Sequence, residues 1–190
     1  TVPHDAEGLA SLMGGRKALA SRLDEFFATP ETAEAKFSGS YRQVIHEMTE
    51  ARDVRMGMSA HSNQPAHHIP WMYVAAGQPW KTQQITREIM RRLYLGSEIG
   101  QGYPGDEDNG EMSAWYNFAM LGLYPLRMGS PEYVIGSPAF ERAEGARLAR
   151  APDPPQRREV GEQDHRREQR QLQCCTPSHC WIRAASRSAS

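Results

Sequence analysis

The spacing of apolar residues along the chain predicts a series of helices over roughly the first 142 of its 190 residues. Leucine, isoleucine, methionine and aromatic residues recur three or four positions apart, which places them on one face of a helix. Glycine, proline and short polar stretches separate these segments and act as turn signals. The segments predicted to be helical span residues 6–13, 16–27, 41–51, 66–77, 83–95 and 112–125, the last ended by Gly122 and Pro125, and residues 131–138 predict a short β-like run.

Residues at the ends of these segments predict where the helices start and stop. Asp5 and Thr82 precede apolar runs and are expected to act as N-caps, as is either Asn109 or Ser113 before the last helix. Gly77 is expected to end the segment before it. The apolar positions expected to pack inward are Leu9, Leu12, Met13, Leu19, Leu23, Phe26, Phe27, Tyr41, Val44, Ile45, Met48, Ile85, Ile89 and Leu93.

The order of the elements indicates a helical fold class. Helices joined by short loops run antiparallel to their neighbours, as they do in bundles and αα-barrels. Strands alternating with helices are absent from the pattern, which argues against a parallel sheet with a phosphate-binding turn. We therefore expect an all-α fold with a short β segment near residues 131–136.

The composition changes near residue 142. Residues 143–190 are rich in Arg, Glu, Gln and Pro and contain few large apolar residues. Such a segment buries too little surface to offset the entropy of ordering it. The sequence therefore predicts a folded region, 1–142, and a disordered tail, 143–190. Cys174, Cys175 and Cys180 lie in that tail with a spacing that fits no standard zinc site, so we interpret them as free thiols.

Net charge and hydropathy exclude some classes of partner. The formal net charge is −1 at pH 7, so no overall field draws the chain toward nucleic acid or an anionic membrane. No stretch is apolar over the length needed to span a bilayer. The first residues, TVPHDAEG, lack the basic and apolar features of a signal peptide. We expect neither nucleic acid nor a membrane as a partner.

The segment HSNQPAHHIPWMY concentrates polar side chains. Asn63 and Gln64 offer donors and acceptors that suit sugar hydroxyls, and their carbonyl oxygens suit a hard cation such as Ca²⁺. His61, His67 and His68 do not follow the spacing of a helical zinc motif. An equally weighted alternative is a helix cap at Asn63 with the histidines on the surface.

Trp80 follows a Gly-Gln-Pro turn just before a predicted helix. A tryptophan in a loop offers a flat apolar face on which a sugar ring packs. The alternative, which is favoured when this residue is taken alone, is a hydrophobic staple that fixes how the chain approaches the next helix.

Three consecutive acids, Asp106, Glu107 and Asp108, precede an apolar helix. In an extended loop Asp106 and Asp108 would point to one side, where two carboxylates bind Ca²⁺ or activate a water. An EF-hand is excluded, because Gly110 comes one position early and Asn117 replaces the closing Glu. Acids before a helix also stabilise it through its dipole, and this explanation is favoured when the loop is taken alone.

Six segments in a fixed order carry more information than any one of them: VPHD, NQPAHHIPWMY, AGQPWKTQ, GYPGDEDNGEMSAWY, LGLYP and EYVIGSPAF. Together, over about residues 1–142, they resemble glycoside hydrolase family 92, the calcium-dependent exo-α-mannosidases. The resemblance implies an N-terminal β-sandwich domain and a C-terminal (α/α)₆ barrel. This chain would supply the last part of that barrel, and the other parts would be its partners.

The resemblance also implies inverting hydrolysis of terminal α-linked mannose on glycans or mannans, with the α-1,2 linkage as the first expectation. Inversion requires a carboxylate base and a carboxylic acid about 6.5–9.5 Å apart. Asp106 and Asp108 match the family's water-activating pair, with Asp108 favoured as the base. The positions that match the substrate pocket are His4, Asp5, Asn63, Gln64 and Trp80, and those that match the calcium site are Asn63, Gln64 and Asp108.

The chain departs from the family pattern in two ways. Gln64 stands where many relatives have Glu, which changes the charge beside the calcium. The family's general acid is a Glu shortly before VPHD, and the 190 residues do not contain it. General acid–base catalysis contributes typically about 10²–10⁴-fold, so we expect the isolated chain to be a fragment that is inactive or nearly so. Relatives are commonly exported, so an extracellular or periplasmic location is expected. The alternative is a non-catalytic helical module that binds carbohydrate or calcium.

Overall fold

The chain forms short helices followed by a small antiparallel sheet. The computed structural model describes residues 2–94, 101–142 and 181–183. The α-helices are α1 (Ala6–Leu12), α2 (Arg16–Ala28), α3 (His46–Val54), α4 (Met72–Ala75), α5 (Pro79–Ile89) and α6 (Glu111–Leu121). Single 3-10 turns span Ala35–Phe37, Gly39–Tyr41, Gln64–Ala66 and Ile69–Trp71, and a π-helical turn, Met90–Tyr94, continues α5.

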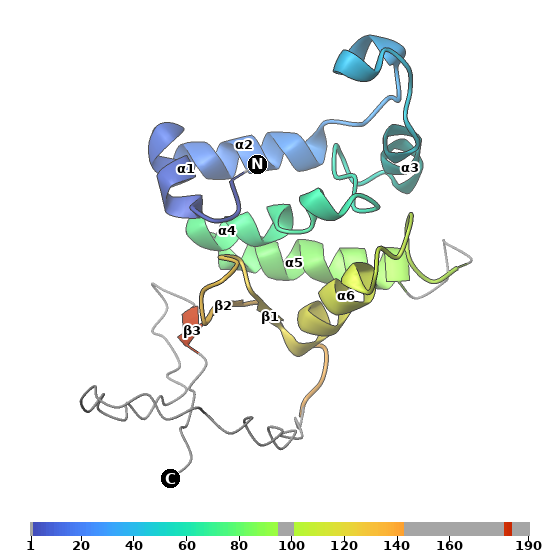
Figure 1. Cartoon of the computed structure of the whole chain (residues 1–190). Coiled ribbons are helices and arrows are strands. Elements are labelled where there is room, and N and C mark those ends of the chain that lie inside the picture. The colour runs from blue at the N-terminus through green and yellow to red at the C-terminus, as the bar shows by residue number, and fades with distance from the viewer. Residues whose placement is uncertain (1, 95–100, 143–180, 184–190) are drawn as a thin grey trace, which may run out of the picture.

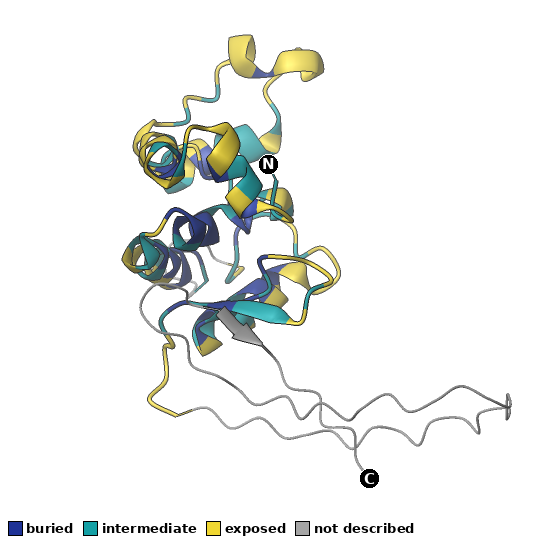
Figure 2. Ribbon diagram, turned by 90° about the vertical axis from the view of Figure 1, so that its left-hand side faces the viewer, coloured by how far each residue is buried: buried dark blue, intermediate teal, exposed yellow. Residues whose placement is uncertain are grey.

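Helices α1, α2, α4 and α5 are stacked on one another, with α6 and the sheet on the far side of α5 (Figure 1). Helix α4 has only 4 residues, too few to be stable by its own hydrogen bonds. It is held by packing against α1, α2 and α5, and the inner faces of the stack are buried (Figure 2). The largest fully buried side chains include Trp71, Tyr73, Leu19, Ile89, Leu93 and Val134.

Strands β1 (Leu123–Tyr124), β2 (Glu132–Ile135) and β3 (Trp181–Arg183) form an antiparallel sheet in that order. Tyr124 lies opposite Val134, and its ring stacks on that of Trp71 with centroids 4.9 Å apart. The sheet therefore closes one side of the helical core. The β segment predicted near residues 131–136 is confirmed as β2. The fold is mostly helical with a small sheet rather than all-α, and a partial (α/α)₆ barrel stays a prediction.

The predicted helix caps are confirmed at Asp5 and wrong at Thr82. The Asp5 carboxylate accepts a hydrogen bond from the Gly8 backbone N–H at 2.8 Å, as an N-cap does. Thr82 lies inside α5, where its buried hydroxyl donates to the Pro70 carbonyl at 2.8 Å. Helix α5 begins at Pro79 instead. Proline suits the first helical position because a backbone N–H there would have no acceptor within the helix, and proline has none to donate.

The predicted apolar faces are partly buried and partly exposed. Leu12 is 87% exposed at the end of α1, and Tyr41 is 66% exposed in a 3-10 turn. Arg42 has a left-handed φ of 56°, which ends that turn, so α3 begins only at His46. The predicted inward positions that are buried are Leu19, Leu23, Ile89 and Leu93.

The predicted tail, 143–190, lies almost entirely outside the described residues, and so do its three cysteines. Strand β3 is the exception: its 3 residues pair with β2, which differs from the disorder predicted for them. Within the described ranges, no helix has the combination of length and apolar character needed to cross a membrane.

Candidate functional site

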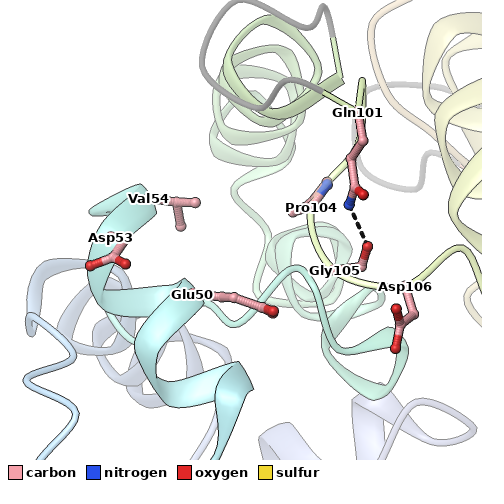
Figure 3. A pocket seen from close by; sticks show the side chains of 7 residues that line it. All are labelled: Glu50, Asp53, Val54, Gln101, Pro104, Gly105 and Asp106. Carbon is pink, nitrogen blue, oxygen red and sulfur yellow. Dashed lines mark hydrogen bonds between the residues drawn. The ribbon is translucent and has the colours of Figure 1, made fainter.

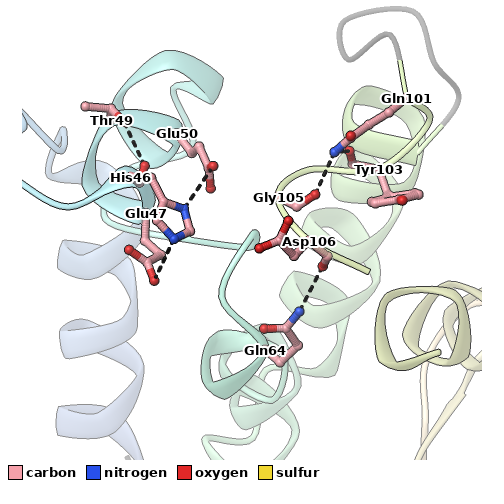
Figure 4. Close-up of polar contacts among 9 residues, drawn as sticks. All are labelled: His46, Glu47, Thr49, Glu50, Gln64, Gln101, Tyr103, Gly105 and Asp106. Carbon is pink, nitrogen blue, oxygen red and sulfur yellow. Dashed lines mark hydrogen bonds and ion pairs between the residues drawn. The ribbon is translucent and has the colours of Figure 1, made fainter. Parts of the chain in front are cut away.

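The acidic loop, residues 101–110, lies directly against the polar segment 61–64. A Cβ built on Gly105 would lie 2.7 Å from the Ser62 Cβ, so the two stretches touch with no space between them. The side-chain amide of Gln64 donates a hydrogen bond to the Asp106 carbonyl at 3.1 Å (Figure 4). The acidic loop and the polar segment, which were predicted from the sequence as separate candidates, therefore lie together in one candidate site.

A buried aromatic cluster supports the polar segment. The rings of His61 and His67 stack with centroids 4.5 Å apart, and His61 meets Trp115 of α6 edge-on at 4.4 Å. The Nε2 atom of His61 lies 2.8 Å from the Tyr94 hydroxyl, and the Trp115 indole N–H donates to the His67 carbonyl at 3.0 Å. The cluster thus ties the polar segment to α6 and to the turn after α5.

The histidines of this cluster are buried, so their predicted place on the surface is wrong. The cap predicted in the same alternative is correct in position only, since Asn63 precedes the 3-10 turn Gln64–Ala66 without a capping side-chain hydrogen bond. His61 and His67 are each only 2% exposed. Burial lowers the pKa of His67 to about 4. Burial, with a smaller contribution from His67, also holds the pKa of His61 well below its usual value. Both rings are therefore neutral at neutral pH and serve as packing groups.

Helix α3 faces the acidic loop across an open cavity of about 470 Å³. Many of the groups around it are carboxylates and amides, which suit a ligand rich in hydroxyl groups. The cavity is lined by Glu50, Asp53 and Val54 from α3 and by Gln101, Pro104, Gly105 and Asp106 from the loop (Figure 3). Glu50 and Gln101 were not among the predicted site residues, because neither stands in a motif of its own. Gln101 does stand directly before the Gly-Tyr-Pro-Gly turn.

His46, the first residue of α3, brings a titratable group to the same region. Its ring nitrogens lie 3.2 Å from Glu50 and 3.4 Å from Glu47 (Figure 4). The hydrogen bond to Glu50, followed by the charge of Glu47 and a smaller contribution from Asp106, raises the pKa of His46. A protonated His46 offsets part of the negative charge around the cavity.

Gly110 stands at the N-cap of helix α6, so the prediction of Asn109 or Ser113 as its cap is wrong. Glu107 bonds the first turn of the helix instead. Its carboxylate accepts hydrogen bonds from the backbone N–H groups of Gly110 and Ser113. Hydrogen bonds from the side chain and backbone of Ser113, together with that from Gly110, lower the pKa of Glu107. The middle acid of the three is therefore used to hold the loop on the helix.

Asp106 and Asp108 lie in different backbone settings. The loop is coiled rather than extended at Asp108, because Asp108 and Asn109 both adopt left-handed φ values, 51° and 55°. Asp106 lines the cavity, and Asp108 is not among its lining residues. Both carboxylates are exposed to solvent on the same loop.

The other predicted pocket residues lie at the starts of helices. His4 and Asp5 are exposed at the start of α1, with Asp5 used as its cap. Trp80 lies in the first turn of α5 rather than in a loop and is 58% exposed, which argues against a buried staple. No described hydrogen bond or ring contact in residues 2–94 and 101–142 joins these three to Asp106 or Asp108.

The donor set of the site fits a hard cation such as Ca²⁺. In the part of the chain that the structure describes, no group of three or more His, Cys, Asp or Glu side chains is placed to hold a metal. Gln64 uses its amide nitrogen on the Asp106 carbonyl, which leaves its amide oxygen for another ligand. No described hydrogen bond engages the Asn63 side chain. Amide oxygens, like the carboxylates of the acidic loop, are typical ligands for Ca²⁺.

Comparison with known proteins places the chain in a family. Residues 1–152 match the model of the glycosyl hydrolase family 92 catalytic domain, so the chain belongs to this family. It is also 27% identical, over 140 residues, to an uncharacterized secreted glycosidase from Arthroderma benhamiae. That match covers 74% of this chain and 14% of the relative.

Solved structures of the same family are similar in sequence and in fold. A family GH92 inverting mannosidase from Bacteroides thetaiotaomicron is 46% identical, with a TM-score of 0.54 over 74% of this chain and 18% of that one. A GH92 α-mannosidase from the same organism, in complex with mannoimidazole, is 33% identical, with a TM-score of 0.57 over 72% of this chain and 16% of that one. The chain therefore spans less than a fifth of the length of these relatives.

Proposed function

We propose that this chain supplies the water-activating part of an inverting exo-α-mannosidase, which removes terminal α-linked mannose from glycans or mannans. The observation that carries the proposal is the position of Asp106, which lines a polar cavity while its loop is held on the Asn63–Gln64 segment. Family membership and the 46% identity to an inverting mannosidase support this class of reaction. The α-1,2 linkage is the first substrate to test.

In an inverting reaction a carboxylate takes a proton from water as the water attacks the anomeric carbon. Asp106 and Asp108 form the pair that orients and deprotonates this water. Asp106 faces the cavity and contacts the ligand directly, and Asp108 acts from the same loop. The 190 residues hold the family's motif for the base and not that for the acid, so this chain alone is expected to turn over little or no substrate.

The proposal includes a bound Ca²⁺. The side-chain oxygens of Asn63 and Gln64 and a carboxylate of the acidic loop, Asp108 being the candidate from sequence, would hold it. When bound, the ion supplies positive charge that attracts sugar hydroxyls and favours a distorted ring. His4, Asp5 and Trp80 remain proposed contacts to the substrate.

We also propose that the protein acts outside the cytoplasm, in the periplasm or the extracellular space. The support is the name of one relative, which is described as a secreted glycosidase.

The experiment measures mannose release from α-1,2-mannobiose by the native full-length protein, with and without a chelator. Asp106→Asn and Asp108→Asn are each expected to reduce turnover by about 10²–10⁴-fold, and the chelator is expected to reduce it as well. Glu34→Gln removes an exposed carboxylate outside the cavity and serves as the control. If the protein binds mannose but does not hydrolyse α-1,2-mannobiose, it is instead a non-catalytic binding module.

A further inference from the structure

The side chain of Gln101, the first residue of the acidic loop, folds back onto the loop and holds its backbone. Its Nε2 atom donates to the Gly105 carbonyl at 2.6 Å and to the Tyr103 carbonyl at 3.0 Å. The first of these bonds is drawn in Figure 3. Carbonyl oxygens only accept hydrogen bonds, so the group that faces them must be the NH₂ of the amide and not its oxygen.

Gln64 makes the equivalent contact at the next peptide. Its Nε2 atom donates to the carbonyl of Asp106 at 3.1 Å. The two carbonyls that flank the Asp106 Cα, those of Gly105 and Asp106, therefore each accept a hydrogen bond from a glutamine amide. Figure 4 shows the two glutamines on opposite sides of the loop, with Asp106 between them. Rotating either peptide plane would turn the Asp106 side chain and break one of these bonds.

The contact between Gly105 and Ser62 further restricts the backbone of the acidic loop. Gly105 has a φ of +68°, and its Cα lies so close to Ser62 that an added Cβ would be 2.9 Å from the Ser62 carbonyl oxygen. The loop cannot move toward the polar segment, the Gln64 amide opposes its movement away, and the Gln101 amide fixes the shape of the loop itself. The backbone at Asp106 is thus constrained from three sides by residues outside the acid triplet.

We propose that Gln101 is a positioning residue for Asp106, acting with Gln64 to fix the peptide planes on either side of it and so to aim its carboxylate into the cavity. This role rests on the proposed hydrolytic function of that carboxylate. It also gives a physical reason for glutamine at position 64, because a glutamate there has no N–H to donate to the Asp106 carbonyl.

The expected effect is on the reaction rather than on folding. Gln101 is exposed, so loss of its two hydrogen bonds removes little buried contact. A displacement of one carboxylate of the water-activating pair by about 1 Å, in contrast, can reduce the rate by about 10²-fold.

The test uses the native full-length protein with three variants. Gln101→Met has a similar length and no donor, Gln101→Lys again has N–H groups to donate, and Gln84→Met makes the same change at an exposed position on α5. For Gln101→Met, kcat for α-1,2-mannobiose is expected to fall by about 10- to 100-fold. Its KM and melting temperature are expected to stay close to those of the parent. Gln101→Lys should recover part of the loss, and Gln84→Met should behave as the parent.

Two results would overturn the positioning role. One is an unchanged kcat in Gln101→Met when Asp106→Asn is inactive, which leaves the proposed function intact. The other is a loss of activity that follows a loss of folded protein, with no recovery in Gln101→Lys. Full activity in Asp106→Asn would instead contradict the proposed function itself, so the two failures are distinguishable.

Discussion

Gly105 and Ser62 pack so closely that position 105 has no room for a side chain. An added Cβ would lie 2.7 Å from the Ser62 Cβ and 2.9 Å from its carbonyl oxygen. The backbone φ of +68° at Gly105 is also one that other residues rarely adopt. Glycine at this position is therefore what allows the acidic loop to reach the Asn63–Gln64 segment and form a single site with it.

The first prediction concerns this contact. Gly105→Ala should push the acidic loop away from Ser62 and weaken binding of Ca²⁺ or mannose, because the ligands from the two segments would no longer meet. Isothermal titration of Ca²⁺ and of methyl α-mannoside measures the effect. Gly102→Ala is the matched control, since Gly102 has a positive φ of +89° but no atom within 4 Å of its added Cβ. Equal losses in both variants would show that backbone strain matters and the contact with Ser62 does not.

The second prediction is a loss of stability in mild acid that arises from the buried histidines. Burial lowers the pKa of His67 to about 4 from the usual 6.5, so the unfolded chain binds this proton more tightly than the folded one. The stabilising contribution of neutral His67 to the free energy of unfolding is fully present above pH 6.5. It falls as the pH is lowered and levels off below pH 4. A shift of this size corresponds to about 3 kcal/mol in the free energy of unfolding, and His61 acts in the same direction.

Urea unfolding between pH 7 and pH 4 measures this dependence. His67→Gln should have a lower free energy of unfolding at pH 7 but a flatter pH dependence, since it has no proton to take up. His4→Gln changes an exposed histidine and should keep the slope of the parent. The same slope in all three proteins would contradict the assignment to His67.

The third prediction concerns the hydroxyl of Thr82, which attaches the 3-10 turn Ile69–Trp71 to α5. It is buried and donates to the Pro70 carbonyl at 2.8 Å. Thr82→Val keeps the shape of the side chain but leaves this carbonyl unsatisfied, which should lower the free energy of unfolding by about 1–3 kcal/mol. Thr82→Ser retains the hydroxyl and should lose less. A larger loss in the serine variant would show that the methyl group, not the hydrogen bond, is the stabilising part.

The sequence predicted helix ends correctly where the signal is local. It was wrong where contacts with residues farther along the chain determine the role of a side chain. Asp5 caps α1 because its carboxylate bonds a backbone N–H 3 residues along the chain, an interaction visible in the sequence. Thr82 resembles a cap by the same local rule, yet its hydroxyl bonds Pro70, 12 residues away, from within α5. Gly110 is the N-cap of α6, and Glu107 can bond its first turn because the chain turns back at Asp108 and Asn109, whose left-handed φ values have no unique sequence signal.

Only part of the candidate site was predicted, because its other features also depend on contacts between distant segments. The motifs around Asn63 and Asp106 carried enough chemistry to be selected, and the structure brings these two segments together. The coiled backbone at Asp108 and the cavity wall provided by Glu50 depend on tertiary structure, so the sequence did not reveal them. Gln101 precedes the Gly-Tyr-Pro-Gly turn, but its proposed role follows only from the two carbonyls that its side chain contacts.

The most direct test of the central claim follows the anomeric configuration of the mannose first released from α-1,2-mannobiose, by proton NMR. The native full-length protein should release β-mannose, as an inverting enzyme does. The rate should fall by about 10²–10⁴-fold in Asp106→Asn, which removes one carboxylate of the pair that orients and deprotonates the water. Release of α-mannose as the first product, or full activity in Asp106→Asn, would contradict the assignment of this loop as the water-activating part of an inverting site.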